Sequence, residues 1–412
     1  VLVWALASGL EQPSFDATVV MTRWMFPYIG FMSLVALAGG ILNTWRKFAV
    51  PAASPVLLNV ALILAIVFAN PWFTRHGIEP IYSQCVGVMV GGVLQLGLQL
   101  VGLKRLGMLP HVGRSMQAMK SAWADPGTRK VLRLMGPALL GVSVAQISLL
   151  INTQIASHLA PGSVSWITNA DRLMEFPTAM LGVALGVVLM PQLSAVQANR
   201  NDVEYSAMLD WGLRLVVLLS IPCSVGLLLF AKPLVATLFN YHAFHAGDVD
   251  RTAAALMNYG VGLIGIVSIK VLAPGFYARQ DTATPMRVAV GVLVLVQVLN
   301  YFLVPPLQHA ALTLSISIGA TVNALLLLAV LIRRGSYRPS PGWGRYLLQV
   351  IVASALLAVF LMWGANAFEW TGANVEKAKR IWSLILMLLF SGVIYFVALR
   401  LTGLRVKALL RH

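Results

Sequence analysis

The nine residues Asn169 to Pro177, NADRLMEFP, place three charged side chains close together in a very apolar part of the chain. Asp171, Arg172 and Glu175 are followed by a stretch, TAMLGVALGVVLMP, that carries no charge. A charge within a membrane helix costs at least ~2.5 kcal/mol, so such residues usually face a bundle interior or a water-filled cavity. An arginine here suits the oxygens of a phosphate, and carboxylates suit a cation or a proton.

On a helix of 3.6 residues per turn, these charges share one face with other small or polar residues. Arg172 and Glu175 are three residues apart and can form an ion pair, and Asp171 and Glu175 are like-charged neighbours. The spacing predicts that the two acids hold Arg172 between them and that the stripe faces a cavity, although a structural clamp between helices would use the same residues. Pro177 predicts a kink at the following turn. The predicted stripe comprises Thr168, Asp171, Arg172, Glu175, Thr178, Gly182 and Gly186.

The charges of this segment sum to −1, so an anionic cargo would need further cations. Lys270 lies inside a predicted helix, residues 250–277, on the cytoplasmic side of its middle. We predict it as a further cargo contact; the alternative is that its long side chain reaches the membrane surface. His242 and His245, in YHAFHAG, are too few for a specific metal site and are predicted to lie in a solvated connection.

The whole chain is too apolar for a soluble protein. Of its 412 residues, 58% are hydrophobic and 11% are charged, whereas soluble proteins carry about 25% charged residues. The net charge of +16 comes mostly from Lys and Arg in short connections, which indicates membrane topology rather than a nucleic-acid surface. The sequence has no GxSxG, HExxH, Walker A or nucleotide-binding motif, and its 14 acidic residues are scattered. These features predict a transporter rather than an enzyme.

The apolar stretches predict an all-α polytopic membrane protein with eleven complete membrane helices, each near the roughly 20 residues that a bilayer requires. Lys and Arg gather in alternate connections, which predicts a cytoplasmic C-terminus; the basic group at 377–380 is the one discordant connection. Gln146, Asn152 and Asn300 lie inside predicted helices and could hydrogen-bond across them or contact a substrate; we favour a role in helix packing. The predicted spans are 18–44, 54–70, 79–103, 129–159, 163–198, 204–238, 250–277, 284–304, 309–333, 343–365 and 379–401.

An internal repeat relates the two halves of the chain. The segments ILNTWRKFAVPAASP (41–55) and VLAPGFYARQDTATP (271–285) each end a helix, pass a basic aromatic turn and reach Pro before the next helix. Both copies face the same way, which predicts parallel repeats about an axis along the membrane normal. The repeat also predicts that two helices and most of a third precede Val1, and that the pair at 343–401 lies outside the repeat.

Several motifs resemble the MurJ/MviN family of lipid II flippases, within the multidrug/oligosaccharidyl-lipid/polysaccharide exporter superfamily. The resemblance runs from about Asp16 to the C-terminus and is carried by FPYIGFMSLVALAGGILNTWRKFAVPAASPVLLN, GPALLGVSVAQISLLINT, ADRLMEFP and KVLAPGFYARQD. It implies two pseudo-symmetric six-helix lobes around a cationic cavity and a C-terminal helix pair that forms a groove for a polyprenyl tail. The implied domains are the remainder of the N-terminal lobe at 1–105 (helices 3–6 of the family), an inter-lobe linker at 106–128, the C-terminal lobe at 129–334 (helices 7–12), and the C-terminal pair with a cytoplasmic tail at 335–412.

The function implied by the resemblance is movement of lipid II, the undecaprenyl-pyrophosphate-linked peptidoglycan precursor, from the cytoplasmic to the periplasmic leaflet for cell wall synthesis. Alternating access would move the cargo in the bacterial inner membrane. By motif match the transport residues are Arg172 and Glu175, with Asp171 beside them and Lys270 as a further contact. No cofactor is implied; Na⁺, H⁺ or the membrane potential would drive the cycle. The expected partners are lipid II and membrane lipids, with no nucleic acid, and the protein is expected to be a monomer.

Three alternatives stay open at the level of the sequence. A cation-coupled multidrug exporter of the same superfamily would use the acids as its working groups and Arg172 as their counter-ion. A membrane enzyme acting on polyprenyl phosphates would need a cluster of catalytic acids or histidines. A lipid scaffold without turnover would leave the charged stripe without a purpose.

Overall fold

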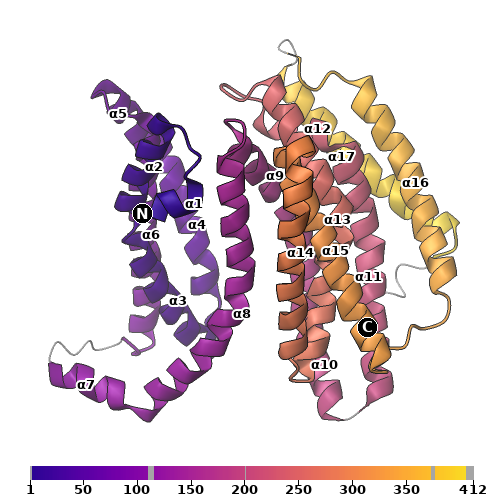
Figure 1. The fold of residues 1–412 in the computed structure, drawn as a ribbon, viewed down its shortest axis with the longest axis horizontal. Helices are drawn as coiled ribbons and strands as arrows, with labels where there is room; N and C mark the ends of the chain where they lie inside the picture. Colours follow the sequence, from indigo (N-terminus) through magenta and orange to yellow (C-terminus); the bar gives the residue numbers. More distant parts are fainter. Residues whose placement is uncertain (1, 110–115, 200, 373–375, 405–412) are drawn as a thin grey trace. The chain divides into compact units, whose positions relative to one another are not determined.

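The computed structural model describes residues 2–109, 116–199, 201–372 and 376–404, and these residues contain helices and no strand. The chain divides into two compact units, Val1–Ala138 and Leu139–His412 (Figure 1). Residues 110–115 of the predicted linker and residues 405–412 of the predicted tail lie outside the described part.

Unit 1 is built on α6, which packs against α3 and α4. A Cβ on Gly91 of α6 would lie 2.7 Å from Leu58 of α4, so the two helices approach closely because this glycine has no side chain. Gln95 and Gln99 then reach across to α4, where they donate hydrogen bonds to the Ser54 carbonyl (3.0 Å) and hydroxyl (2.8 Å). The elements are α1 (Leu2–Ala7), α2 (Gln12–Met25), α3 (Tyr28–Thr44), α4 (Ala49–Leu64), the π-helical η1 (Ala65–Ala69), α5 (Asn70–Arg75), the 3₁₀ turn η2 (Pro80–Tyr82), α6 (Ser83–Arg105) and α7 (Met116–Ala124).

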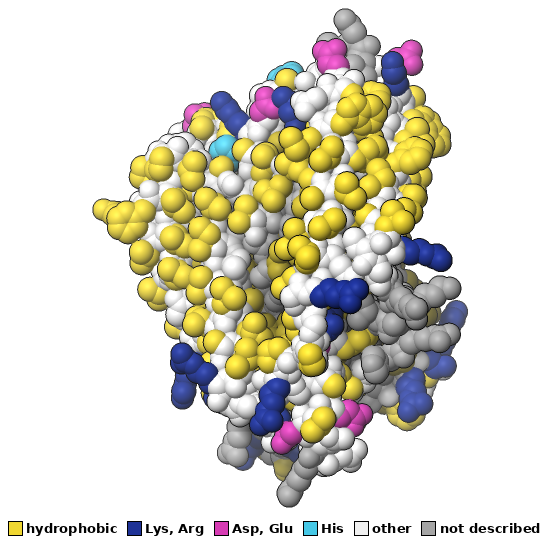
Figure 2. Space-filling view, turned by 90° about the vertical axis from the view of Figure 1, so that its right-hand side faces the viewer, with side chains coloured by type: hydrophobic (Ala, Val, Ile, Leu, Met, Phe, Trp, Pro, Cys, Tyr) yellow, Lys and Arg dark blue, Asp and Glu magenta, His cyan; other side chains and the backbone are white. Residues whose placement is uncertain are grey.

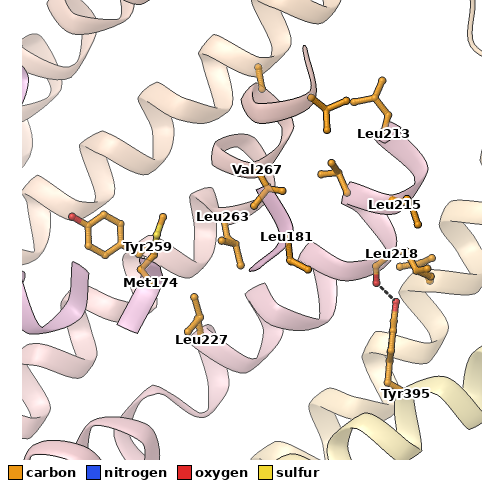
Figure 3. Close-up of a cluster of buried hydrophobic side chains, with 14 of the residues drawn as sticks. Met174, Leu181, Leu213, Leu215, Leu218, Leu227, Tyr259, Leu263, Val267 and Tyr395 are labelled. Carbon is orange, nitrogen blue, oxygen red and sulfur yellow. Dashed lines mark hydrogen bonds between the residues drawn. The ribbon is translucent and has the colours of Figure 1, made fainter. Parts of the chain in front are cut away.

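Unit 2 is built around α13, which packs against α9, α11 and α15. A Cβ on Gly262 would overlap the Ser317 Cα, so α13 and α15 are in backbone contact here. Apolar residues of α13 also pack into the core, and Figure 3 shows Leu263 and Val267 within a buried cluster that also contains Leu181. The elements are α8 (Pro126–Ser157, which begins in unit 1), α9 (Ser163–Pro177), the π-helical η3 (Thr178–Val183), α10 (Ala184–Ala198), α11 (Asp202–Leu229), α12 (Ala231–Phe239), α13 (Ala246–Ala278), α14 (Ala283–Leu307), α15 (His309–Arg333), α16 (Trp343–Ala367) and α17 (Lys377–Leu401).

Within the described residues, eight helical segments are long and apolar enough to cross a membrane, or nine if the bent pair α2–α3 is one span. Two further predicted spans, 129–159 and 163–198, are helical but contain side chains that the structure does not describe. Figure 2 shows hydrophobic side chains over most of the face in view, with most of its acidic side chains at the upper and lower ends. The chain is therefore a multi-pass membrane protein.

Two predicted spans are not continuous helices. The predicted helix 18–44 is bent by 43° between α2 and α3. The predicted helix 204–238 breaks at Phe230, whose backbone leaves the helical region (φ −120°, ψ 14°). The ring of Phe230 is fully buried and meets Trp370 edge-on at 5.4 Å between ring centroids, so packing fixes a break that hydropathy cannot reveal.

Candidate functional site

A cavity of about 650 Å³ lies inside unit 2, between α8, α9, α13, α14 and α15. Most of its lining is aliphatic, but polar side chains from four of the five helices face it. None of the described lining residues is Lys or Arg. The polar lining residues are Ser148, Asn152, Thr153, Thr168, Asp171, Glu175, Tyr259 and Asn323.

Two of the predicted site residues, Asp171 and Glu175, lie on the wall of this cavity. Asp171 is half-buried, and Tyr259, a buried residue of α13, lies beside it on the same cavity wall. Glu175 is exposed one turn further along α9. Thr168 lines the same wall, so this part of the predicted polar stripe faces a cavity in the bundle.

Arg172 is placed differently from its acidic neighbours. It is exposed, does not line the cavity and forms no ion pair within 4 Å among the described residues. The predicted clamp, with Arg172 held between Asp171 and Glu175, is therefore wrong. Consecutive helical residues point about 100° apart, so turning Asp171 into the cavity directs Arg172 away from it.

Lys270 lies where α13 crosses the segment after α9. A Cβ on Gly182 would lie 2.8 Å from the Lys270 Cγ, and one on Gly186 would lie 3.2 Å from the Lys270 carbonyl oxygen. These two glycines thus make room for the stem and backbone of Lys270. The residue is exposed and does not line the cavity.

The turn after Pro177, where the sequence predicts a kink, is a π-helical segment, η3, that begins at Thr178. Pro177 has no N–H to donate to the carbonyl of Leu173, so the regular α-helical pattern cannot continue through this turn. Short π-helical segments widen a helix locally and often occur at functional sites. Here the segment separates the charged turn of α9 from the apolar α10.

A cluster at the helix N-termini holds the start of α9. The buried Trp166 donates from Nε1 to Asp248 of α13 at 2.9 Å. The Arg251 guanidinium lies 4.4 Å from the Trp166 ring centroid, and the His309 ring lies 5.1 Å from it. His245 is the N-cap of α13 and forms a capping box with Asp248. The sequence carries a signal for this helix cap, the three-residue spacing of His245 and Asp248. The prediction of a solvated connection did not use it.

Asn300 of α14 donates to Asn152 of α8 at 2.9 Å, so these two residues hydrogen-bond across helices, which agrees with the favoured role in helix packing. Among the described residues, no group of three or more His, Cys, Asp or Glu side chains is close enough to hold a metal ion. The chemistry of the site therefore comes from two separated parts. The carboxylates of the cavity suit a cation or a proton, and the exposed guanidinium of Arg172 suits an anion.

Comparisons with known proteins give one consistent family. The family model described as Lipid II flippase MurJ matches residues 1–382. Lipid II flippase MurJ of Burkholderia cenocepacia is 50% identical over 405 residues, which cover 98% of this chain and 77% of that protein. Probable lipid II flippase MurJ of Vibrio cholerae is 35% identical over 405 residues, 98% of this chain and 75% of that protein.

A solved structure titled "Lipid II flippase MurJ, inward closed conformation" matches with a TM-score of 0.76. The match covers 96% of this chain and 76% of that chain at 20% identity. At this identity the structural match shows a shared fold.

Proposed function

The chain belongs to the MurJ family of lipid II flippases, and on this premise we propose that it carries lipid II from the cytoplasmic to the periplasmic leaflet of the bacterial inner membrane. The observation that carries the proposal is the 50% identity to a lipid II flippase over nearly the whole chain. The function is that of a transporter for a membrane-bound lipid. The multidrug exporter is not favoured, because the family model and these relatives are lipid II flippases.

We propose that the cycle is alternating access between two pseudo-symmetric six-helix lobes of a monomer. Residues 1–105 would belong to the N-terminal lobe, 129–334 to the C-terminal lobe and 335–412 to the C-terminal pair and a cytoplasmic tail. The parallel sequence repeat supports this arrangement. A gradient of Na⁺ or H⁺, or the membrane potential, would supply the energy.

Within this cycle Arg172 binds the pyrophosphate of the cargo. A guanidinium donates two parallel hydrogen bonds to phosphate oxygens, and Arg172 is exposed and has no ion-pair partner among the described residues. Lys270 serves as a second cation for the same anion. Asp171 and Glu175 act in the cavity, where their charge favours a cation or a proton rather than the cargo phosphate.

The test uses cells depleted of their own lipid II flippase and supplied with this protein. The amount of lipid II accessible at the outer leaflet is measured for the wild type, Arg172→Ala and Arg172→Lys. Arg287→Ala is the matched control, because Arg287 is another exposed arginine of unit 2. We expect the wild type and Arg287→Ala to restore exposure, Arg172→Ala to lose it, and Arg172→Lys to retain part of it.

No restoration by well-expressed wild type would refute the lipid II function. Full restoration by both Arg172 variants would keep the function and remove Arg172 from the cargo site. Equal losses in Arg172→Ala and Arg287→Ala would point to a general requirement for positive charge.

A further inference from the structure

A buried acid of α11 binds the connection that leads into the C-terminal helix pair, α16–α17. Asp210 is 4% exposed, and its Oδ1 accepts hydrogen bonds from the Tyr337 hydroxyl (2.8 Å) and the Trp343 indole (2.7 Å). The same oxygen accepts from the backbone N–H of Ser340 at 3.2 Å. Its other oxygen, Oδ2, forms an ion pair with Arg214 at 2.8 Å. A buried carboxylate with this many donors is fixed in position by them.

Arg214, one turn after Asp210, extends the contact to α16. Its guanidinium lies 5.1 Å from the Trp343 ring centroid and 5.4 Å from that of Tyr346, and it donates to the Pro341 carbonyl at 3.2 Å. In return, the Tyr346 hydroxyl donates to the Arg214 carbonyl at 2.6 Å. The first turn of α16 is therefore bound to both the side chain and the backbone of Arg214.

The contact continues along α11 in both directions. Ser206 exchanges hydrogen bonds with the backbone of Arg338, accepting from its N–H at 2.9 Å and donating to its carbonyl at 3.2 Å. The Tyr395 hydroxyl of α17 donates to the Leu218 carbonyl at 2.5 Å (Figure 3). The residues of α11 that hold the pair recur every four positions, which places them on one face of the helix: Ser206, Asp210, Arg214 and Leu218.

This face orients the pair as well as attaching it. Apolar packing alone tolerates small rotations and shifts, whereas hydrogen bonds to a buried carboxylate require defined geometry. The exposed side of α17 carries an apolar strip of side chains that ends at an arginine, a surface suited to contact with a hydrocarbon chain that has a phosphate at its end. The strip comprises Leu388, Leu389, Gly392, Val393, Phe396, Val397 and Arg400.

We propose that Asp210 is a positioning residue for transport: it fixes α16–α17 on α11, so that the polyprenyl tail of the cargo is held in one position relative to the transport unit. The inference rests on the function proposed above. The proposed role of Asp210 is to help hold the polyprenyl tail. Asp210 lies on α11 and does not line the cavity.

The experiment compares the reconstituted wild type with Asp210→Ala, Asp210→Asn and Asp202→Ala. Asp202 is the matched control, because it also lies on α11 and pairs with an arginine, but its carboxylate is exposed. Transport is measured for lipid II with its full tail and for an analogue with a short tail. We expect Asp210→Ala to raise the KM for the full-tailed substrate about tenfold with a small change in kcat, and to leave the short-tailed KM nearly unchanged. Asp210→Asn, which keeps an acceptor oxygen, should recover part of the loss.

A second measurement does not depend on transport. Spin labels are placed at two exposed positions, Val261 of α13 and Leu356 of α16, after replacement of the two native cysteines. We expect the distance distribution between the labels to broaden in Asp210→Ala and to stay narrow in Asp202→Ala. Asp210→Asn supplies the same comparison if the alanine variant fails to fold.

The outcomes separate this inference from the proposed function. If the wild type moves lipid II but Asp210→Ala affects both substrates equally, or leaves the label distances unchanged, the positioning role is wrong and the function stands. If the wild type moves no lipid II, the proposed function fails, and with it the role in holding the tail. The label distances then still report whether Asp210 fixes the pair.

Discussion

Tyr395→Phe should be unusually costly for the loss of one hydroxyl group. Pro222 lies inside α11 and has no N–H, so the carbonyl four residues earlier, that of Leu218, lacks its helical donor. The Tyr395 hydroxyl replaces that donor at 2.5 Å (Figure 3), and Tyr395 is 3% exposed. Removing the hydroxyl leaves a buried carbonyl unpaired, so we expect the free energy of unfolding to fall by about 1–3 kcal/mol.

Tyr346→Phe is the matched control in the same helix pair. The Tyr346 hydroxyl also donates to a carbonyl of α11, that of Arg214, at 2.6 Å. By the helical pattern, however, the Arg214 carbonyl also accepts from the N–H of Leu218, so it keeps a partner when the hydroxyl is lost. We expect the loss to be smaller, about 0.5–1.5 kcal/mol, the net value of an ordinary hydrogen bond.

A double-mutant cycle with Pro222→Ala isolates the physical cause. The substitution Pro222→Ala would supply the missing N–H to the Leu218 carbonyl, so Tyr395→Phe should cost less in this background, with a coupling energy of about 1 kcal/mol. The assay is equilibrium unfolding in detergent micelles, followed by tryptophan fluorescence. Equal costs of Tyr395→Phe in the wild-type and Pro222→Ala backgrounds would refute the reasoning.

Two further predictions concern the turn after α13 and the contact between α13 and α15. Hydrogen bonding from Arg334, and then from Thr284, lowers the pKa of Asp281 to about 2 from its ordinary value of 3.8. The ion pair thus adds stability that is present above about pH 4 and lost as the pH falls towards 2. We expect the free energy of unfolding to fall by about 1 kcal/mol over that range, with half-exposed Arg334 limiting the size of the loss. Arg334→Gln should reduce this pH dependence, leaving the part that comes from the Thr284 hydrogen bonds. Gly262→Ala would place a Cβ against the backbone of Ser317, so we expect it to lower the free energy of unfolding by about 1–3 kcal/mol. At the control position Gly291 a Cβ would meet no atom within 4 Å, so Gly291→Ala should be neutral or stabilise the protein by up to about 1 kcal/mol.

The sequence predicts the bounds of a helix well where hydrophobicity alone determines them. The predicted span 309–333 has the same bounds as α15, and the other described spans agree within a few residues. The bend between α2 and α3 and the break at Phe230 were not predictable from hydropathy. Both depend on how the flanking residues pack, and an apolar residue at a break has the same hydropathy as one inside a helix.

The candidate site was predictable in part. Helical periodicity correctly groups Asp171 and Glu175 on one wall, because the angle per residue is fixed by the helix. It does not predict the surroundings of Arg172, since an ion pair three residues along a helix also depends on rotamers and on the cavity beside it. Three of the hydrogen bonds to Asp210, those from Tyr337, Ser340 and Trp343, come from residues 127 to 133 positions away, and no spacing rule within one helix could find them.

Under the proposed function, the separation of charge on α9 bears on how the cargo would be bound. If the two acids neutralised Arg172, pyrophosphate would have to displace them, and their repulsion would offset much of the gain. Instead, among the described residues, Arg172 is without an ion pair and the carboxylates of Asp171 and Glu175 line a cavity without Lys or Arg. One turn of one helix therefore presents an anion-binding group in one direction and cation-binding groups in another. Pro177 and η3 follow directly, so under the proposed function we expect a change in this segment to move both sets of charges together and to couple the cavity to the cargo site.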